Sequence, residues 1–561
     1  MRHRRDSRGA HGAWRGLSVV ALGLWVLGVA CKQEPRPSGG GSVRARVEAE
    51  KRAARLPVKG VRRLAGVVQD LRASADGRLL TVLVDAKKPT VEGVPPPMRV
   101  GELWAIPTEG GTPARIAQGV TNLPGGWLVS PDSRWIIASA NWDPARQHGA
   151  LEVADARNLA ADPVLVSNRV SYAITTEDGA KLAWIEDGVL SVGPLPSGPW
   201  RQVAGEVSTA EFSPEGRYVY FRRRYAAAGG LYQVDLSEPR PQPRRMLDQV
   251  AEYTVLRSGK LVVANARATP ADRVFQLHVF DVAKLNGRKL SDDALHYRVS
   301  RDGKYLAWRS ASVKGDQADI GELWLAELPH GAPRKLGSLV KDFEFSPDGR
   351  RLVYRENYVE LPLGGREAQV GDSKLEKVGD LFLVELPAGL PRLLQRLCPN
   401  FLFSADGRAL AYTGRIERPE VTRRLFLMGD SGAPIALKDW LYEYQFRPGT
   451  SELFFRADCT REGRSCDLSS VTAAAPKAKK EAGGVFGTRF AADGSRVILG
   501  FAHLTDDTFD LTTRELSTGK ELPIDQYVEW PALILGEKGE HVAYLVHEKN
   551  RSGVYVASTE P

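Results

Sequence analysis

The chain has 561 residues, of which 43% are hydrophobic and 26% charged, a composition that is ordinary for a folded soluble protein. The length exceeds what one hydrophobic core usually serves, so we expect either two packed units or one array of repeats. Part of the formal charge of +9 lies at the N-terminus, where five arginines and Asp6 contribute a net four. The remaining positive charge is dispersed, which argues against nucleic acid as a partner.

The first thirty residues have the pattern of an export signal. A basic stretch is followed by an apolar run from Leu17 to Ala30, which stops at Cys31. As a helix this run would span about 21 Å, less than the roughly 30 Å of a bilayer core. We therefore predict a signal peptide over residues 1–30 rather than a permanent membrane anchor.

Val29 and Ala30 before Cys31 resemble the end of a bacterial lipobox. The resemblance implies that Cys31 is acylated, so that a lipid holds the mature chain on a membrane. The alternative is an ordinary signal peptide with a cysteine nearby. Residues 31–60 then form a tether rich in Pro, Gly and Ser. Lys32 is not the Asp that keeps enteric-type lipoproteins in the inner membrane, so the resemblance favours the outer membrane.

A six-residue pattern recurs along the rest of the chain and predicts its fold. Its clearest copy is Phe345-Ser-Pro-Asp-Gly-Arg350, echoed at residues 212–217 and 403–408. With weaker copies there are eleven, most about 45 residues apart. Pro fixes φ at the turn entry, Asp bonds nearby backbone and Gly accepts a positive φ, so the pattern indicates a hairpin turn.

Apolar runs follow most copies of the turn, as in residues 305–308 and 321–328, and they are apolar on both faces. Strands with two buried faces are typical of sheets packed between neighbouring sheets. Four strands at a period near 45 residues predict β-propeller blades. The repeats resemble the TolB-type, WD-like propellers of bacterial envelope proteins. The sequence therefore predicts an all-β protein of about eleven four-stranded blades.

Eleven blades exceed the four to eight of most propellers, so we expect two tandem rings. The preferred division gives an N-terminal propeller of about five blades over residues 61–290 and a C-terminal one of about six over 291–561. A division into seven and four competes with it. The chain ends just after the third strand of the last repeat. We expect residues 61–65 to supply the missing fourth strand by pairing with residues 553–557, which removes an unpaired edge.

Sequence motifs do not indicate catalysis or a cofactor. The segment Gly429-Asp-Ser-Gly-Ala-Pro434 resembles the surroundings of a trypsin-type serine, but it falls where other repeats place a turn. The chain has no Gly-x-Ser-x-Gly, His-Glu-x-x-His or Cys-x-x-Cys motif and no phosphate-binding loop, so we expect neither a metal nor a cofactor. A catalytic site made of carboxylates that distant repeats bring together at a channel mouth remains an open alternative. The spacing of residues in the sequence does not reveal such a site.

The remaining cysteines divide into a pair and a single residue. Cys459 and Cys466 flank a turn-rich segment, and in an exported chain we expect them to form a disulfide rather than stay as free thiols. Cys398 is expected to be a buried small apolar residue. Residues 473–484, which include three lysines, are expected to form an exposed loop, with a basic contact site as the alternative.

Three long connections between second and third strands are candidates for a binding face: residues 86–100, 356–378 and 414–422. Long loops on a rigid scaffold often carry binding, although tolerated insertion is an equal alternative. The candidate contact residues form a mixed apolar and basic set that suits an acidic or peptide-like partner. They are Lys87, Lys88, Tyr358, Leu361, Leu363, Arg366 and Arg418.

Together these features favour a non-catalytic interaction or scaffolding module, tethered in the bacterial envelope and periplasm through Cys31 and holding a protein or peptide partner. The alternative is a hydrolase or lyase with an active site at a channel mouth, acting on envelope glycans or peptides. A convergent group of carboxylates or histidines would favour the enzyme.

Overall fold

The computed structural model describes residues 60–89, 98–123, 125–223, 229–267, 274–310, 320–362, 375–416, 422–430, 432–439, 441–460, 464–503, 507–546 and 551–560. These residues are all-β, with many four-stranded antiparallel sheets and no helix that could cross a membrane. The predicted signal peptide and the tether lie outside the described residues, apart from Gly60.

The sheets divide into eleven four-stranded blades, numbered here in chain order. Blade 1 contains β2 (Val68–Ala73), β3 (Leu79–Lys87), β4 (Val100–Pro107) and β5 (Ala114–Thr121), and blade 2 contains β6 (Trp127–Val129), β7 (Trp135–Asp143), β8 (His148–Asp155) and β9 (Val164–Thr175). Blade 3 adds β10 (Lys181–Glu186), β11 (Val189–Pro194) and β12 (Arg201–Ala204) to β9. Blade 4 contains β13 (Val207–Phe212), β14 (Tyr218–Arg223), β15 (Gly230–Asp235) and β16 (Arg244–Asp248).

Blade 5 contains β17 (Val250–Val255), β18 (Leu261–Ala266), β19 (Phe275–Asp281) and β20 (Asn286–Val299). Blade 6 adds β21 (Tyr305–Ser310), β22 (Gly321–Glu327) and β23 (Arg334–Phe345) to β20, and blade 7 adds β24 (Arg351–Pro362), β25 (Leu375–Glu385) and β26 (Arg392–Cys398) to β23. Blade 8 contains β27 (Phe401–Phe403), β28 (Leu410–Ile416), β29 (Thr422–Met428) and β30 (Pro434–Asp439). The long strands β9, β20 and β23 each end one blade and begin the next, which joins blades 2 and 3 and blades 5 to 7 into continuous sheets.

Blade 9 contains β31 (Leu441–Phe446), β32 (Leu453–Ala457), β33 (Cys466–Val471) and β34 (Lys479–Val485). Blade 10 contains β35 (Gly487–Phe490), β36 (Arg496–Ala502), β37 (Phe509–Glu515) and β38 (Glu521–Val528). Blade 11 contains β39 (Leu533–Leu535), β40 (His541–Val546), β41 (Gly553–Ser558) and β1 (Val61–Ala65). Of residues 473–484, expected to form an exposed loop, residues 479–484 instead belong to β34, the outer strand of blade 9.

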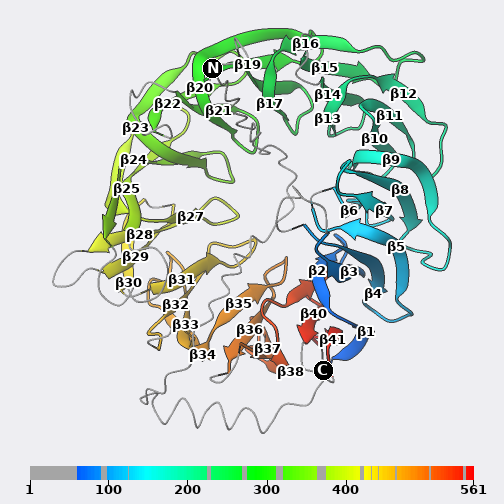
Figure 1. The fold of residues 1–561 in the computed structure, drawn as a ribbon. Helices are drawn as coiled ribbons and strands as arrows, with labels where there is room; N and C mark the ends of the chain where they lie inside the picture. The colour runs from blue at the N-terminus through cyan, green and yellow to red at the C-terminus, as the bar shows by residue number, and fades with distance from the viewer. Residues whose placement is uncertain are drawn as a thin grey trace, which may run out of the picture.

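The N-terminal strand completes the last blade, as predicted. β1 pairs antiparallel with β41, with Val61 opposite Val556 and Ala65 opposite Gly553. The last blade therefore contains both ends of the described chain, and the outer edge of β41 is covered (Figure 1).

The blades follow one another around one closed ring (Figure 1). Each hydrophobic cluster is shared by two consecutive blades; Val263 of blade 5 and Trp308 of blade 6 lie in one such cluster. Another cluster joins Val556 of blade 11 to Val82 of blade 1. The apolar faces recognised in the sequence are thus buried between neighbouring blades.

The structure does not contain the two rings expected from the sequence. The boundary near residue 290 falls inside β20, which pairs with β19 on one side and with β21 on the other. A ring of five blades would require blade 5 to pack on blade 1, but blade 5 packs on blade 6. The repeats are local patterns, so they specify each blade without specifying which blade closes the ring.

The recurrent turn has the geometry that its residues predict. The Ser346 hydroxyl donates to Asp348 at 2.6 Å and accepts the Arg351 N–H at 2.9 Å, while Gly349 has a φ of +71°. A Cβ on Gly407, in the next turn, would lie 2.6 Å from the Asp348 carboxyl carbon. Glycine is therefore needed twice, for the backbone conformation and for the contact between adjacent turns.

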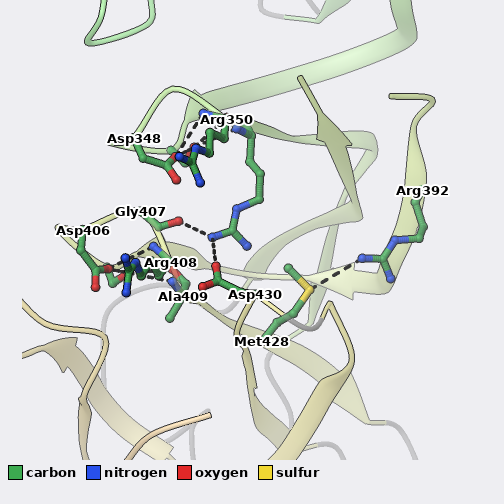
Figure 2. A network of polar contacts seen from close by, with 12 residues as sticks. Asp348, Arg350, Arg392, Asp406, Gly407, Arg408, Ala409, Met428 and Asp430 are labelled. Carbon is green, nitrogen blue, oxygen red and sulfur yellow. Dashed lines mark hydrogen bonds and ion pairs between the residues drawn. The ribbon is translucent and has the colours of Figure 1, made fainter. Parts of the chain in front are cut away.

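Basic side chains join many of the blades to the next blade through backbone carbonyls. At the turns, Lys181 donates to the carbonyl of Gly216 at 2.6 Å and Arg447 to that of Gly494 at 2.7 Å. The buried Arg351 donates in the same way to Gly407 and lies 3.9 Å from Asp430 (Figure 2). Much of the dispersed positive charge therefore has a structural role in the ring.

Candidate functional site

The antiparallel order of each blade gives the ring two different faces. The recurrent turns join first to second strands on one face, which we call the turn face. The links between blades and the connections between second and third strands lie on the opposite face, the link face. All three predicted binding loops are connections of the second kind and begin on the link face.

One of these connections extends beyond the body of its blade. In blade 7, β24 pairs with β23 only as far as Glu356, and β25 pairs with β26 only from Gly379. Beyond these points the two strands pair with each other, from Val359 opposite Val378 to Pro362 opposite Leu375. We call residues 357–362 and 375–378 the arm.

The arm exposes apolar side chains on the link face. Val359 is 41% exposed and Leu375 46%, and Leu339 beside the base of the arm is 43% exposed. Leu361 and Tyr358 are half-buried. The Tyr358 ring lies 5.5 Å from the Lys341 ammonium and 5.9 Å from the Arg355 guanidinium carbon. The arm therefore offers the mixed apolar and basic character that the sequence suggested.

The outer side of the arm is attached to blade 8 by charge. Glu376 is buried, and its carboxylate lies 3.2 Å from the buried Arg415 and also accepts a hydrogen bond from Arg423. At the base, the Asn357 amide donates to Asp380 at 3.2 Å. A buried carboxylate with two arginines fixes one geometry, because separating them would leave a buried charge without a partner.

The predicted binding residues do not form one site. Lys87 and Lys88 are exposed on blade 1, whereas Tyr358 and Leu361 belong to blade 7 on the other side of the ring (Figure 1). Leu363, Arg366 and Arg418 lie outside the described residues. Sequence reasoning missed Glu376 and its arginines, because the partners are 39 and 47 residues apart and no local pattern links them.

Two glutamates, on the first strands of blades 4 and 7, have raised side-chain pKa values. Burial raises the pKa of Glu211 on β13 to about 7, and it also raises the pKa of Glu344 on β23. The same Glu-Phe-Ser-Pro sequence surrounds both, so comparing the repeats residue by residue would have identified them. Burial also raises the pKa of Tyr172 and Tyr253, and a nearby negative Glu211 adds to this effect.

The described residues contain no group of three or more His, Cys, Asp or Glu side chains that could hold a metal ion. Gly429-Asp-Ser-Gly-Ala-Pro434 is the connection between β29 and β30, which confirms a turn for its described residues. A shallow hollow on blades 8 and 9 is lined by Arg424, Lys438, Asp439 and Asp458, whose charges form two ion pairs.

Cys459 and Cys466 form the predicted disulfide, which closes the link-face connection of blade 9. Cys398 is buried, and burial raises the pKa of its thiol to about 12, so it has little thiolate at neutral pH. Cys31 lies outside the described residues.

Comparisons add little beyond the fold. No family model and no curated protein matches the sequence. Among solved structures, a eukaryotic initiation factor is 13% identical, with a TM-score of 0.36, over 68% of this chain and 94% of that one. An oligogalacturonate lyase in complex with manganese is 12% identical, with a TM-score of 0.29, over 64% and 98%. Kuenenia stuttgartiensis hydrazine synthase is 17% identical, with a TM-score of 0.29, over 57% and 97%. At these TM-scores the likenesses carry no argument about function.

Proposed function

We propose that the chain is a non-catalytic interaction module of the bacterial envelope, of TolB-like type, which is tethered to the outer membrane through Cys31 and captures a protein or peptide partner with the arm of blade 7. The export signal and the lipobox-like residues support the location. The closed ring supports a rigid scaffold, on which projecting segments commonly carry binding.

The observation that carries the proposal is the arm itself. It combines exposed Val359 and Leu375 with an outer side fixed by the buried Glu376. A rigid projection loses little conformational entropy on binding, and segments that project from a rigid scaffold commonly carry binding.

The test is a variant in which residues 357–378 are replaced by a two-residue Asn-Gly turn between Glu356 and Gly379. Partner capture is measured by crosslinking in intact cells, with circular dichroism and melting to show that the ring is intact. A Leu390→Ser variant is the matched control, because Leu390 is 84% exposed on the same blade at a turn-face connection. Full capture by the folded, shortened variant would place the binding surface elsewhere.

The lipid tether is tested separately at Cys31. Detergent partitioning and mass spectrometry of the mature N-terminus should find an acylated Cys31, and Cys31→Ser should release the chain into the water phase. A mature N-terminus at another residue, or a water-soluble wild-type chain, would contradict the tether while leaving the arm proposal in place.

A hydrolase or lyase at the channel mouth is the second candidate, and Glu211 is the observation that favours it. A carboxyl whose pKa is raised to about 7 can both hold and release a proton at neutral pH, as general acid–base catalysis requires. Turnover of envelope glycans or peptides that disappears in Glu211→Gln and Glu344→Gln would favour the enzyme over the interaction module.

A further inference from the structure

Glu211 has a carboxyl group without a partner on the inner side of the ring. It lies on β13, the first strand of blade 4, and the first strands face the centre of the ring (Figure 1). The side chain is half-buried, and no described residue donates a hydrogen bond to its carboxylate or forms an ion pair with it. Burial of a carboxylate that has neither a donor nor a cation is unfavourable, which is why its pKa is raised to about 7.

The other carboxylates on first strands have a partner or a cation in reach. The hydrogen-bonded pairs are Asp70 with Arg72, Glu252 with Asn265, Asp342 with Arg355 and Glu443 with Arg456. Glu344, at the position of Glu211 in blade 7, is acted on by the charge of Arg298. In blade 4 the arginine that corresponds to Arg355 is Arg222, and it donates instead to the Thr209 hydroxyl and to the carbonyl of Ala251.

Two tyrosine hydroxyls end beside Glu211, one from each neighbouring blade. Tyr172 of blade 3 donates to the carbonyl of Ala210 at 3.3 Å. Tyr253 of blade 5 donates at 3.3 Å to the carbonyl of Tyr220, the residue paired with Glu211 across β13 and β14. Because each hydroxyl proton is used in this way, each oxygen has only lone pairs left to offer. The surroundings of Glu211 therefore present hydrogen-bond acceptors, namely one carboxylate and two hydroxyl oxygens.

A group that complements these acceptors must bring positive charge and N–H donors. A primary ammonium group carries one positive charge and three donors, which matches one carboxylate and two hydroxyl oxygens. A metal ion would need several oxygen ligands, and the described residues contain no group of three His, Cys, Asp or Glu side chains that could hold one. Glu252 on the next blade adds negative charge, and the nearby Arg222 is already bound elsewhere.

The geometry points to a binding site for a primary alkylammonium group at Glu211, formed together with Tyr172 and Tyr253. The group belongs to a free amine or to a lysine side chain. The site lies on blades 3 to 5 and the arm on blade 7, so the inference goes beyond the proposed interaction module and does not depend on it.

Binding requires the ionised form of Glu211, so the affinity depends on pH. With a pKa of about 7, about 10% of Glu211 is ionised at pH 6 and about 90% at pH 8, whereas an alkylammonium stays protonated throughout. Of the groups around it, Tyr172, Tyr220 and Tyr253 have pKa values raised by burial and stay neutral, and Arg222 stays charged. The affinity should therefore increase about tenfold from pH 6 to pH 8.

The probe is methylammonium chloride, with binding to the whole mature chain measured by titration calorimetry at constant ionic strength. The tenfold increase from pH 6 to pH 8 should disappear in Glu211→Gln together with the binding itself. Glu215→Gln, at an exposed position on the turn of the same blade, should change neither. Glu252→Gln should retain the pH dependence, because burial also raises the pKa of Glu252 and its titration is thereby separated from that of Glu211.

Calorimetry at pH 7 in two buffers of different ionisation enthalpy should show the release of about half a proton for each methylammonium bound. Nα-acetyl-lysine amide distinguishes the two sources: binding as tight as that of methylammonium identifies a lysine side chain as the ligand, and exclusion identifies a free amine. Binding of methylammonium that is independent of pH or that survives in Glu211→Gln would overturn the site. Equal binding of potassium ions, or no binding of methylammonium at about 100 mM, would overturn it as well.

Discussion

Arg334, on the part of β23 that forms the outer strand of blade 6, donates a hydrogen bond of 3.0 Å to the carbonyl of Gly389 in blade 7. The same relationship occurs on both sides of it: Arg288 of blade 5 donates to Gly331 of blade 6, and Arg392 of blade 7 to Gly432 of blade 8. These bonds make the outer rim continuous from blade 5 to blade 8. Each one also satisfies a turn carbonyl of the next blade.

The first prediction concerns the equivalent contacts at the turns. Arg351 is 5% exposed and donates to the Gly407 carbonyl, whereas its neighbour Arg350 is exposed. Arg351→Met should destabilise the fold by about 1–3 kcal/mol, because the Gly407 carbonyl loses its donor. Arg350→Met should stay within about 0.5 kcal/mol of wild type. Urea denaturation measures both, and equal effects would show that the contact does not stabilise the ring.

The second prediction concerns ring closure. Deleting residues 56–65 removes β1 and uncovers the edge of β41, so the melting temperature should fall by several degrees. Deleting residues 32–50 shortens the tether and should leave the melting temperature unchanged. A melting temperature unaffected by loss of β1 would show that the pairing of β1 with β41 contributes nothing to closure.

The third prediction concerns the cysteines. Non-reducing peptide mapping should find Cys459 joined to Cys466, and the chain-entropy estimate for so short a loop gives about 2.5 kcal/mol of stabilisation. Cys398 is the internal control: it should resist alkylation in the folded chain and react after denaturation. Alkylation of Cys459 and Cys466 in the folded, unreduced chain would contradict the disulfide.

How much the sequence predicts depends on the range of the interactions. The turn at Ser346–Gly349 and the disulfide between Cys459 and Cys466 involve residues close in sequence, so their chemistry was readable there. The pairing of Val61 with Val556 was readable because a missing strand at one end matched a surplus strand at the other.

The interactions between blades could not be predicted from the sequence in the same way. Arg334 looks like any surface arginine in the sequence, and nothing local says that a turn carbonyl of the next blade lies within reach. The four-stranded antiparallel sheets were predicted correctly, but the closure of the ring depends on contacts between residues far apart in sequence, such as Val82 and Val556. For the same reason residues 356–378 were expected only as a long connection, whereas the arm continues β24 and β25 and its outer side is held by Glu376 and residues of blade 8.

The fourth prediction concerns pH. The pKa of Glu211 is raised to about 7 from the ordinary 4.5, so the folded chain holds this proton more tightly than the unfolded chain. Its stabilising contribution is therefore complete below about pH 4.5 and is lost as the pH rises through about 7. Glu211→Gln should remove this loss, so the melting temperature of the variant relative to wild type should increase from about pH 5 to pH 8. Glu109→Gln, at an exposed position, is the control, and a difference independent of pH would refute the assignment.

The last prediction concerns the outer side of the arm. Glu376→Gln leaves Arg415, which is 8% exposed, without its carboxylate, and breaking a buried pair in this way costs about 3–5 kcal/mol. Glu360→Gln removes an exposed pair with Lys377 on the same arm, which is worth at most about 1 kcal/mol. The melting temperature should therefore fall clearly for the first variant and little for the second. Amide exchange at Val359–Leu361 should also accelerate in Glu376→Gln alone, because only that change releases the arm from blade 8. Equal exchange in the two variants would mean that the arm is held by its strand pairing, and that the buried charges contribute to stability without fixing its position.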